Sequence, residues 1–178
     1  QHDQFVPFDP PCDNAATIGG ILSANAHGPL RHAYGTARDW LIGVHVVHAD
    51  GSMSKSGGRV VKNVAGYDMH KLYAGSLGTL GIIAEATLKV APLPRSEVTL
   101  VLTCRSAAQA SDLILAAHDA GLALRAAEVL SPPAANAVLG NEAWSVIVRA
   151  AGEPGTVTRT RSELHAASTA LGAKVDER

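Results

Sequence analysis

The chain has 178 residues, of which 47% are hydrophobic and 17% charged, and its formal net charge is -1 at pH 7. This composition excludes a disordered chain and predicts a packed core, in one ordinary domain or two small ones. The near-zero charge, without a basic block, excludes a typical nucleic-acid-binding surface. No apolar run reaches transmembrane length and no signal peptide opens the chain. We therefore expect a cytoplasmic protein without a transmembrane segment and without a nucleic-acid partner.

Metal binding and nucleophilic catalysis find little support in the sequence. Cys12 and Cys104 lie far apart and form no C-x-x-C pair, so we expect neither a disulfide framework nor a zinc site. His45 and His48 are separated by an odd number of positions, which places them on opposite faces of a strand. No serine stands in a G-x-S-x-G motif. We predict no metal site and assign no catalytic residue.

The first 26 residues predict an irregular entry followed by a short helix. Residues 1–14 are rich in Pro and Asp, which favours irregular backbone. Thr17 can cap a helix within residues 15–26, on which Ile18, Ile21 and Leu22 share a face. Gly19 and Gly20 leave bare backbone N–H groups at its start, which suit an anionic group or a flat ring; close packing of the helix on a neighbour is the alternative.

The next segment predicts a loop and then a hairpin. Residues 27–39 are polar and contain glycine, which indicates a loop, although Asp39 can act as an ion-pair partner or a hydrogen-bond acceptor there. Residues 40–49 alternate as a strand, and Asp50-Gly51 is a strong signal for a hairpin turn. The polar residues 52–56 then predict a return strand at a sheet edge. The strand should place Val44, Val46 and His48 on one face and His45 and Val47 on the other.

The stretch 61–85 predicts a loop, a short helix, a glycine-punctuated turn and the start of a strand. We expect Asp68 to cap the helix, Gly75 to end it, and Met69, Leu72 and Tyr73 to share its apolar face. His70 is expected at the helix surface, with a proton-handling role as the alternative.

Three glycines, Gly75, Gly78 and Gly81, follow at equal spacing, which is not the spacing of the G-x-G-x-x-G dinucleotide fingerprint. They predict either a tight structural turn or bare backbone that faces a ligand. The strand at 82–90 then alternates regularly, with Ile82, Ala84, Ala86, Leu88 and Val90 on one face. Glu85 lies on the opposite face, either beside a ligand or as an edge carboxylate.

A boundary at Pro92, Pro94 and Arg95 precedes a more regular pattern of strands and helices. Strands are predicted at 98–103, 122–130, 144–150 and 173–176, a short helical turn after Pro132-Pro133, and a loop at 152–155. Helices are predicted from Ser106, with a Ser106/Gln109 capping box, and over 156–171, closed by Gly121 and Gly172. This is the strand–helix–strand, strand–helix–strand order of a ferredoxin-like fold.

Several ordered motifs resemble FAD-linked oxidases of the vanillyl-alcohol-oxidase/PCMH type. The central stretch contains KNVAGYD followed by KLYAGSLGTLGII, and upstream lie Asp9-Pro10 and the ATIGG segment at 16–20. Tyr34-Gly35, Arg38-Asp39 and Ala49-Asp50-Gly51 follow the family's order too. These motifs are most similar to those of FAD-binding subunits of glycolate oxidase.

The resemblance implies an α+β fold in two domains. Residues 1–95 would be the second half of a PCMH-type FAD-binding domain, a mostly antiparallel sheet with flanking helices, and residues 96–178 a ferredoxin-like cap module. The ATIGG loop would contact the ribityl chain and ring of FAD, and the GTLGII turn its adenosine side. Residue by residue, the resemblance assigns cofactor contacts to Pro10, Thr17, Ile18, Gly19, Gly20, Asn25, Gly28, Gly81, Ile82 and Ile83.

The implied function is flavin-dependent oxidation of a small 2-hydroxy acid, with glycolate favoured, alongside other flavin and iron–sulfur subunits. Such a protein would be cytoplasmic, or held at the inner face of the membrane through its partner subunits. The family's Gly-rich R-x-G-x-G-[TS] loop, which cradles the pyrophosphate, does not occur in this sequence. That departure leaves open a scaffold subunit that has lost flavin. An oxidase of another alcohol, such as D-lactate or an alditol, also stays open.

Overall fold

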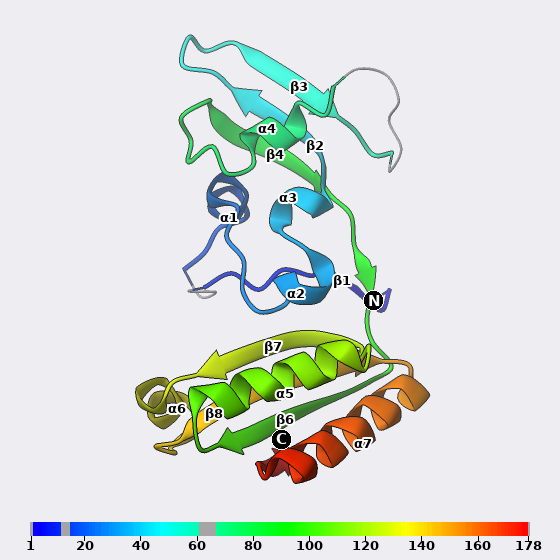
Figure 1. The fold of residues 1–178 in the computed structure, drawn as a ribbon. Coiled ribbons are helices and arrows are strands. Elements are labelled where there is room, and N and C mark those ends of the chain that lie inside the picture. Colours follow the sequence, from blue (N-terminus) through cyan, green and yellow to red (C-terminus); the bar gives the residue numbers. More distant parts are fainter. Residues whose placement is uncertain (1, 12–14, 61–66, 178) are drawn as a thin grey trace. The chain divides into compact units, whose positions relative to one another are not determined.

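The computed structural model describes residues 2–11, 15–60 and 67–177. The chain divides into two compact units, Gln1–Leu93 and Pro94–Arg178, which are described separately. Each unit combines an antiparallel sheet with helices (Figure 1), which confirms the predicted α+β class.

The N-terminal unit contains a three-stranded antiparallel sheet in the order β3-β2-β4, formed by β2 (Leu41–Val47), β3 (Met53–Gly57) and β4 (Ile82–Leu88). The β2–β3 hairpin turns at Asp50-Gly51, as predicted. Gly51 has a φ of 82°, and the Asp50 carboxylate accepts hydrogen bonds from the Ser52 N–H at 2.9 Å and hydroxyl at 2.6 Å. The polar return strand lies at the edge of this sheet, also as predicted. A second, two-stranded sheet pairs β1 (Gln4–Phe5) with β5 (Ala91–Pro92).

One face of the β3-β2-β4 sheet carries the core of the N-terminal unit. Val44 and Val46 of β2 are buried there against residues of α1 (Ile18–Ala24), α3 (Ala37–Trp40) and α4 (His70–Tyr73). The predicted loop at 27–39 instead contains two one-turn helices, α2 (Arg31–Tyr34) and α3. The Asp39 carboxylate accepts the Thr36 N–H at 2.8 Å and thereby caps α3, so the acceptor role expected for Asp39 is the correct one.

The alternation predicted for the strand at 82–90 is broken by a bulge. His45 pairs with Glu85 while the next residue, Val46, pairs with Ile83, so Ala84 is an extra residue in β4. The bulge reverses the side-chain pattern from that point. Ile83 therefore packs on the core together with Ala86 and Leu88, whereas Ile82 is 72% exposed.

The C-terminal unit is a four-stranded antiparallel sheet in the order β7-β8-β6-β9. Its strands are β6 (Ser96–Cys104), β7 (Leu124–Leu130), β8 (Trp144–Gly152) and β9 (Lys174–Glu177). Helix α5 (Ala107–Asp119) connects β6 to β7, and α7 (Pro154–Leu171) connects β8 to β9. This order and connectivity match the ferredoxin-like arrangement predicted from the sequence, with α6 (Pro132–Leu139) added between β7 and β8.

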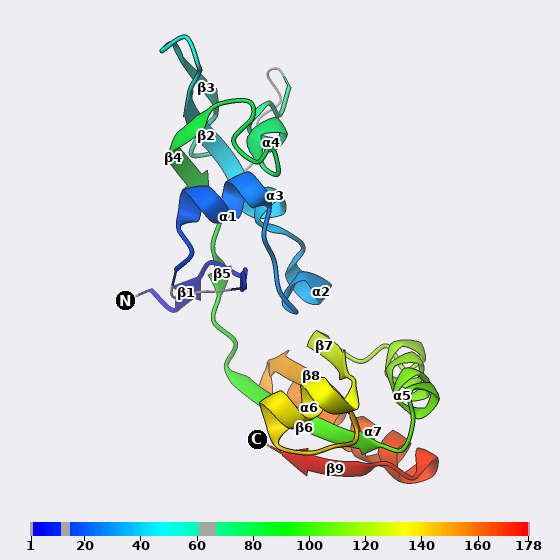
Figure 2. The same cartoon turned by 90° about the vertical axis from the view of Figure 1, so that its left-hand side faces the viewer.

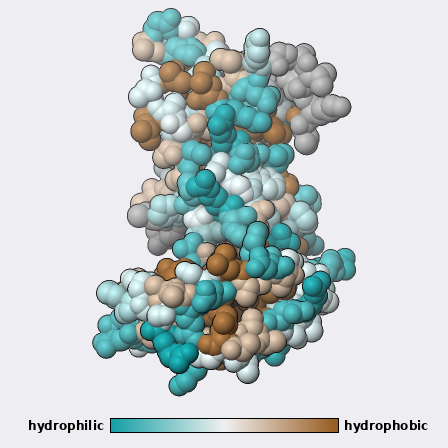
Figure 3. All heavy atoms as spheres, in the orientation of Figure 1, coloured by the Kyte–Doolittle hydropathy of each residue, from teal (hydrophilic) through white to brown (hydrophobic). Residues whose placement is uncertain are grey.

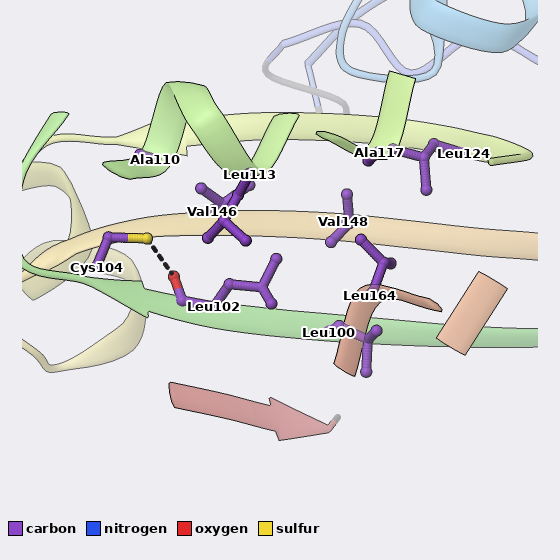
Figure 4. Close-up of a cluster of buried hydrophobic side chains, with 10 residues drawn as sticks. All are labelled: Leu100, Leu102, Cys104, Ala110, Leu113, Ala117, Leu124, Val146, Val148 and Leu164. Carbon is purple, nitrogen blue, oxygen red and sulfur yellow. Dashed lines mark hydrogen bonds between the residues drawn. The ribbon is translucent and has the colours of Figure 1, made fainter. Parts of the chain in front are cut away.

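Aliphatic side chains from the central strands and the two long helices form the core of this unit (Figure 4). Leu100, Leu102, Val146 and Val148 from the strands pack against α5 and α7. Cys104 is a free, buried thiol whose Sγ approaches the Leu102 carbonyl oxygen at 3.5 Å. Burial raises the pKa of this thiol, so Cys104 is an inert core residue.

The start of α5 differs in detail from the predicted capping box. The Ser106 hydroxyl does accept the Gln109 N–H, at 3.2 Å. The Gln109 side chain, however, accepts the Arg105 N–H at 2.6 Å and donates to the Leu171 carbonyl at 2.5 Å, so it links α5 to the end of α7 instead of closing the box. Strand β8 and helix α7 also extend into the loop predicted at 152–155.

Among the described residues, no helix has both the length and the apolar character needed to cross a membrane.

Candidate functional site

The start of α1 presents bare backbone in the N-terminal unit. Thr17 is the N-cap, as predicted, and its hydroxyl accepts the Gly20 N–H at 3.1 Å. The Ile21 N–H bonds to the Thr17 carbonyl at 2.9 Å. The two amides before them, those of Ile18 and Gly19, have no acceptor among the described residues. Two donors are therefore left at the end of the helix that attracts negative charge.

The fold brings the ATIGG segment and the GTLGII segment together. Helix α1 lies next to β4 in both views (Figures 1 and 2), and a Cβ placed on Gly19 would come 3.9 Å from the Ile83 carbonyl oxygen. Apart from the chain neighbours of Gly19 and the backbone of its own helix, no other described atom lies within 4 Å of that position. Gly19 and Ile83 are 64 positions apart in the sequence, so this contact is a product of the fold.

The turn at residues 75–81 is attached to the C-terminal end of α1. The Gly75 N–H donates to the Leu22 carbonyl at 3.0 Å, and the Leu77 N–H donates to the Ser23 carbonyl at 2.9 Å. These bonds satisfy carbonyl groups that a helix end otherwise leaves without partners. Gly75 and Gly78 have positive φ angles of 83° and 77°, as a turn of this kind requires.

Packing inside the protein explains why residue 81 is a glycine. Its φ is 143°, and a Cβ there would lie 2.6 Å from Val46 Cγ1 and 2.8 Å from the Val47 carbonyl oxygen. The turn therefore presses against β2, which supports the structural reading of this glycine. The contact of Gly81 with a cofactor stays a prediction.

Asn25 and Gly28 have clear local roles. Asn25 adopts the left-handed conformation and ends α1, and its side-chain oxygen accepts the Arg38 N–H at 3.0 Å. The Gly28 N–H donates to the Asp9 carboxylate at 3.1 Å, and a Cβ on Gly28 would lie 2.2 Å from the Asp9 carbonyl oxygen. Pro10 is half-buried and directly follows Asp9. The Gly28 amide is thus already used within the fold.

Large apolar side chains are exposed around these two segments. Ile18 is 50% exposed and Ile82 is 72% exposed, and the turn adds Leu77 and Leu80. Figure 3 shows hydrophobic side chains at the surface of this unit. Exposed apolar side chains that gather in one large patch are a common sign of a surface that binds a ligand or another chain.

Helix α4 differs from its prediction in its cap and its buried face. Its N-cap is Met69, and the Asp68 carboxylate instead forms an ion pair with Lys71 at 3.1 Å. Tyr73 is buried as expected, but Met69 and Leu72 are exposed and His70 is 5% exposed. The surface position predicted for His70 is wrong, because this short helix turns the His70 side of its surface toward the sheet. Burial lowers the pKa of His70, and its Nδ1 has no hydrogen-bond partner among the described residues.

The two strand histidines point to opposite faces, as predicted. His45 Nδ1 lies 3.3 Å from the Glu85 carboxylate on the face away from the core, which identifies Glu85 as a paired surface carboxylate. His48 Nε2 lies 2.8 Å from the Ser54 hydroxyl on the other side. Sequence reasoning missed the contacts of His48, since its partners come from β3, α4 and the glycine turn. No group of His, Cys, Asp and Glu within the described ranges is arranged to hold a metal ion.

Two sequence features lie outside the described residues. They are Cys12 and residues 61–66, which include most of the KNVAGYD motif.

A family model for the FAD binding domain matches residues 1–57. This finding confirms the resemblance recognised from the sequence, and it places the capped start of α1 and the β2–β3 hairpin within the matched segment.

Curated relatives extend the match beyond residue 57. The chain is 44% identical over 97 residues to glycolate oxidase subunit GlcD of Bacillus subtilis, covering 54% of this chain and 21% of that protein. It is 40% identical over 98 residues to glycolate oxidase subunit GlcE of Escherichia coli, covering 54% of this chain and 28% of that protein. A mitochondrial D-lactate dehydrogenase (cytochrome) of Arabidopsis thaliana is 35% identical over 130 residues, and this match covers 73% of this chain and 23% of that protein. The chain thus spans less than a third of the length of each of these relatives.

The fold resembles that of a solved alkyldihydroxyacetonephosphate synthase. The TM-score is 0.81 at 19% identity, and the match covers 99% of this chain and 36% of that one. At this level of identity the likeness bears on the fold alone, and it confirms the predicted fold class.

Proposed function

We propose that the N-terminal unit binds FAD along the start of α1 and the start of β4. The contacts are those assigned by the resemblance: Pro10, Thr17, Ile18, Gly19, Gly20, Asn25, Gly28, Gly81, Ile82 and Ile83. The observation that carries the proposal is the approach of Gly19 to the Ile83 carbonyl oxygen at the place where α1 meets β4. The match of residues 1–57 to an FAD binding domain supports it.

The residues at this place suit a flavin. The amides of Ile18 and Gly19 offer two N–H donors, and the absence of a side chain on Gly19 leaves room for a flat group beside them. The exposed side chains of Ile18 and Ile82 offer apolar contact area for rings. Thr17 would keep the helix start in place through its cap, and the backbone of Ile82 and Ile83 would meet the adenosine end.

The proposed reaction is the oxidation of a small 2-hydroxy acid, with glycolate or D-lactate as the substrate. FAD, when bound, would supply the hydride acceptor for the carbon that carries the hydroxyl group. The names of the relatives support this class, since they include glycolate oxidase subunits and a D-lactate dehydrogenase. The contribution of this chain would be to position the flavin and exclude water from it.

The same proposal gives the C-terminal unit the role of a cap module over residues 96–178, preceded by the FAD-binding part over residues 1–95. Its four-stranded ferredoxin-like sheet, with a core formed by residues of that unit, supports a separate module. The proposal includes a cytoplasmic location and other oxidase subunits as partners. The names of two relatives, which are called subunits, support the partners.

Replacing Gly19 with Ala tests the flavin assignment without harming the fold. The nearest described atom to the new methyl group would be the Ile83 carbonyl oxygen at 3.9 Å, and alanine favours a helix over glycine by up to about 1 kcal/mol. We expect unchanged or higher thermal stability of the complete protein with its partner subunits, and FAD affinity lower by about 10-fold or more, or about 1.4 kcal/mol. Both are read from flavin absorbance and circular dichroism.

Gly155→Ala is the matched control, because Gly155 is also the second residue of a helix and has no atom within 4 Å of its Cβ position. It should leave FAD affinity unchanged. If Gly19→Ala also retained full FAD affinity, the start of α1 would not be the flavin site.

A scaffold subunit that has lost its flavin is the second candidate. The observation that favours it is the use of the Gly28 amide by Asp9. The absorption spectrum of the purified complete protein separates the two, since flavin bands would exclude the scaffold function. The 178-residue chain by itself should bind FAD weakly, because the two phosphate charges need N–H groups or cations that no Gly-rich loop supplies here.

A further inference from the structure

A chain of hydrogen bonds connects the β2–β3 hairpin, helix α4 and the glycine turn in the N-terminal unit. His48 Nδ1 lies 3.3 Å from the Leu80 carbonyl oxygen, and His48 Nε2 lies 2.8 Å from Ser54 Oγ. Ser54 Oγ lies in turn 3.3 Å from the Tyr73 hydroxyl oxygen. Tyr73 is 8% exposed, and its ring centroid is 6.2 Å from that of His48. The side chains of Tyr73, Ser54 and His48 therefore form a series of hydrogen bonds that ends at the Leu80 carbonyl of the turn.

The direction of each hydrogen bond follows from the groups that take part. The Leu80 carbonyl oxygen only accepts, so His48 Nδ1 must carry the proton. In the neutral imidazole, Nε2 is then an acceptor, so the Ser54 hydroxyl donates to it. The Ser54 oxygen is left to accept from the Tyr73 hydroxyl. For a neutral imidazole, the network thus selects the Nδ1–H tautomer of His48.

The bond from His48 holds the end of the turn that leads into β4. The beginning of the turn is already fixed to α1 through the Gly75 and Leu77 amides. At its other end, Gly81 packs against Val46 and Val47, where only a residue without a side chain fits. His48 follows these two β2 residues directly, so its side chain fixes the Leu80–Gly81 peptide against the strand.

We propose that His48 is a positioning residue, which fixes the Leu80–Gly81 peptide and thereby the start of β4 at Ile82 and Ile83. Its importance for FAD rests on the proposed function, which places the adenosine end of FAD against Ile82 and Ile83. The hydrogen-bond network itself does not rest on that function. Histidine suits this place because one planar ring reaches the Leu80 carbonyl with one nitrogen and the Ser54 hydroxyl with the other.

The first test measures the tautomer of His48 in the unmodified 178-residue chain. Nitrogen-15 NMR separates the two ring nitrogens by their chemical shifts, and we expect His48 to carry its proton on Nδ1 at neutral pH. A His48 that carries the proton on Nε2 would overturn the proposal. This measurement needs no substitution, so it stands even if a variant fails to fold.

The second test uses two substitutions that each keep one of the two nitrogens of His48. The amide nitrogen of Asn stands close to the place of Nδ1, and that of Gln stands close to the place of Nε2. His48→Asn should therefore keep the bond to Leu80, while His48→Gln should lose it.

The readout is amide hydrogen exchange at Thr79 and Gly81, the residues that flank Leu80. In His48→Gln their exchange should be about 3- to 5-fold faster, the effect of one neutral hydrogen bond of more than average length. In His48→Asn it should stay within about 2-fold of the unmodified chain. The Gly75 amide, which bonds to Leu22, should change in neither variant. His45→Asn is the control for a strand histidine outside the network. Equal exchange in the Gln and Asn variants would refute the positioning role.

Measuring FAD affinity separates the hydrogen-bond network of His48 from the proposed FAD-binding function. If the complete protein binds FAD, His48→Gln should weaken binding more than His48→Asn does. If the NMR results hold and the complete protein binds no FAD, the network stands and the proposed function fails. If the exchange of Thr79 and Gly81 changes as expected while the affinity of bound FAD does not, the start of β4 is not an FAD contact, and the positioning role is limited to the turn.

Discussion

Replacing Gly81 with Ala should destabilise the N-terminal unit strongly. The φ of 143° at this residue lies in a region that only glycine adopts readily, and forcing another residue into it costs about 1–3 kcal/mol. The new Cβ would also lie 2.6 Å from Val46 Cγ1 and 2.8 Å from the Val47 carbonyl oxygen. Val46 is fully buried, so relieving this overlap must shift the core, at about 1–3 kcal/mol more.

The two contributions sum to about 2–6 kcal/mol, a large part of the roughly 5–15 kcal/mol that holds a typical domain together. Urea unfolding is the assay. Trp40 reports on the N-terminal unit and Trp144 on the C-terminal unit, so a Trp144→Phe background isolates the signal of interest. The midpoint for the N-terminal unit should fall in Gly81→Ala without a change in the m-value.

Gly51→Ala is the matched control, since Gly51 also has a positive φ, 82°, but no atom lies within 4 Å of its Cβ position. It should cost only about 1–2 kcal/mol for the backbone conformation. A second check combines Gly81→Ala with Val46→Ala, which removes the nearest overlapping atom and should make the double variant less destabilised than the sum of the two. If Gly81→Ala cost no more than Gly51→Ala, the close approach to β2 would not be what requires glycine at residue 81.

Three further predictions concern single elements. Burial lowers the folded-state pKa of His70, so below about pH 6.5 the unfolded chain binds more protons than the folded chain. The free energy of unfolding should therefore fall as the pH drops from 6.5 through the lowered pKa. Urea titrations of His70→Leu should show a flatter pH dependence. An unchanged pH dependence would contradict the burial of His70. Gln109→Ala should destabilise the C-terminal unit by about 1–3 kcal/mol in thermal unfolding, because the Arg105 amide and the Leu171 carbonyl lose their partner, whereas the exposed Asp112→Ala on the same helix should change little. Residues 94–178 alone should unfold cooperatively by circular dichroism, since their core cluster draws only on that unit, and a broad transition without dispersed NMR signals would refute a separable module.

Sequence patterns that act over a few residues were sufficient for much of the fold. Thr17 caps α1, Asp50-Gly51 turns the β2–β3 hairpin, and Gly172 ends α7 with a positive φ of 71°. The succession of strands and helices after Pro94 was sufficient for the ferredoxin-like order. The resemblance to FAD-linked oxidases likewise rests on the order of short motifs. For the cap and the turns the interacting groups are close in sequence, so the sequence contains the whole interaction.

Only the tertiary structure decided which side chains are buried and why particular glycines are required. His70 and Leu72 lie on the same short helix, yet packing on the sheet buries the first and exposes the second. The extra residue Ala84 reverses the faces of β4, and the pairing with β2 that reveals it joins positions some 38 apart. Gly81 meets Val46 across 35 positions, Gly28 meets Asp9 across 19, and His48 meets Leu80 across 32. Such contacts depend on how the chain closes on itself, and no local pattern of polarity or propensity specifies which distant atom a given residue will meet.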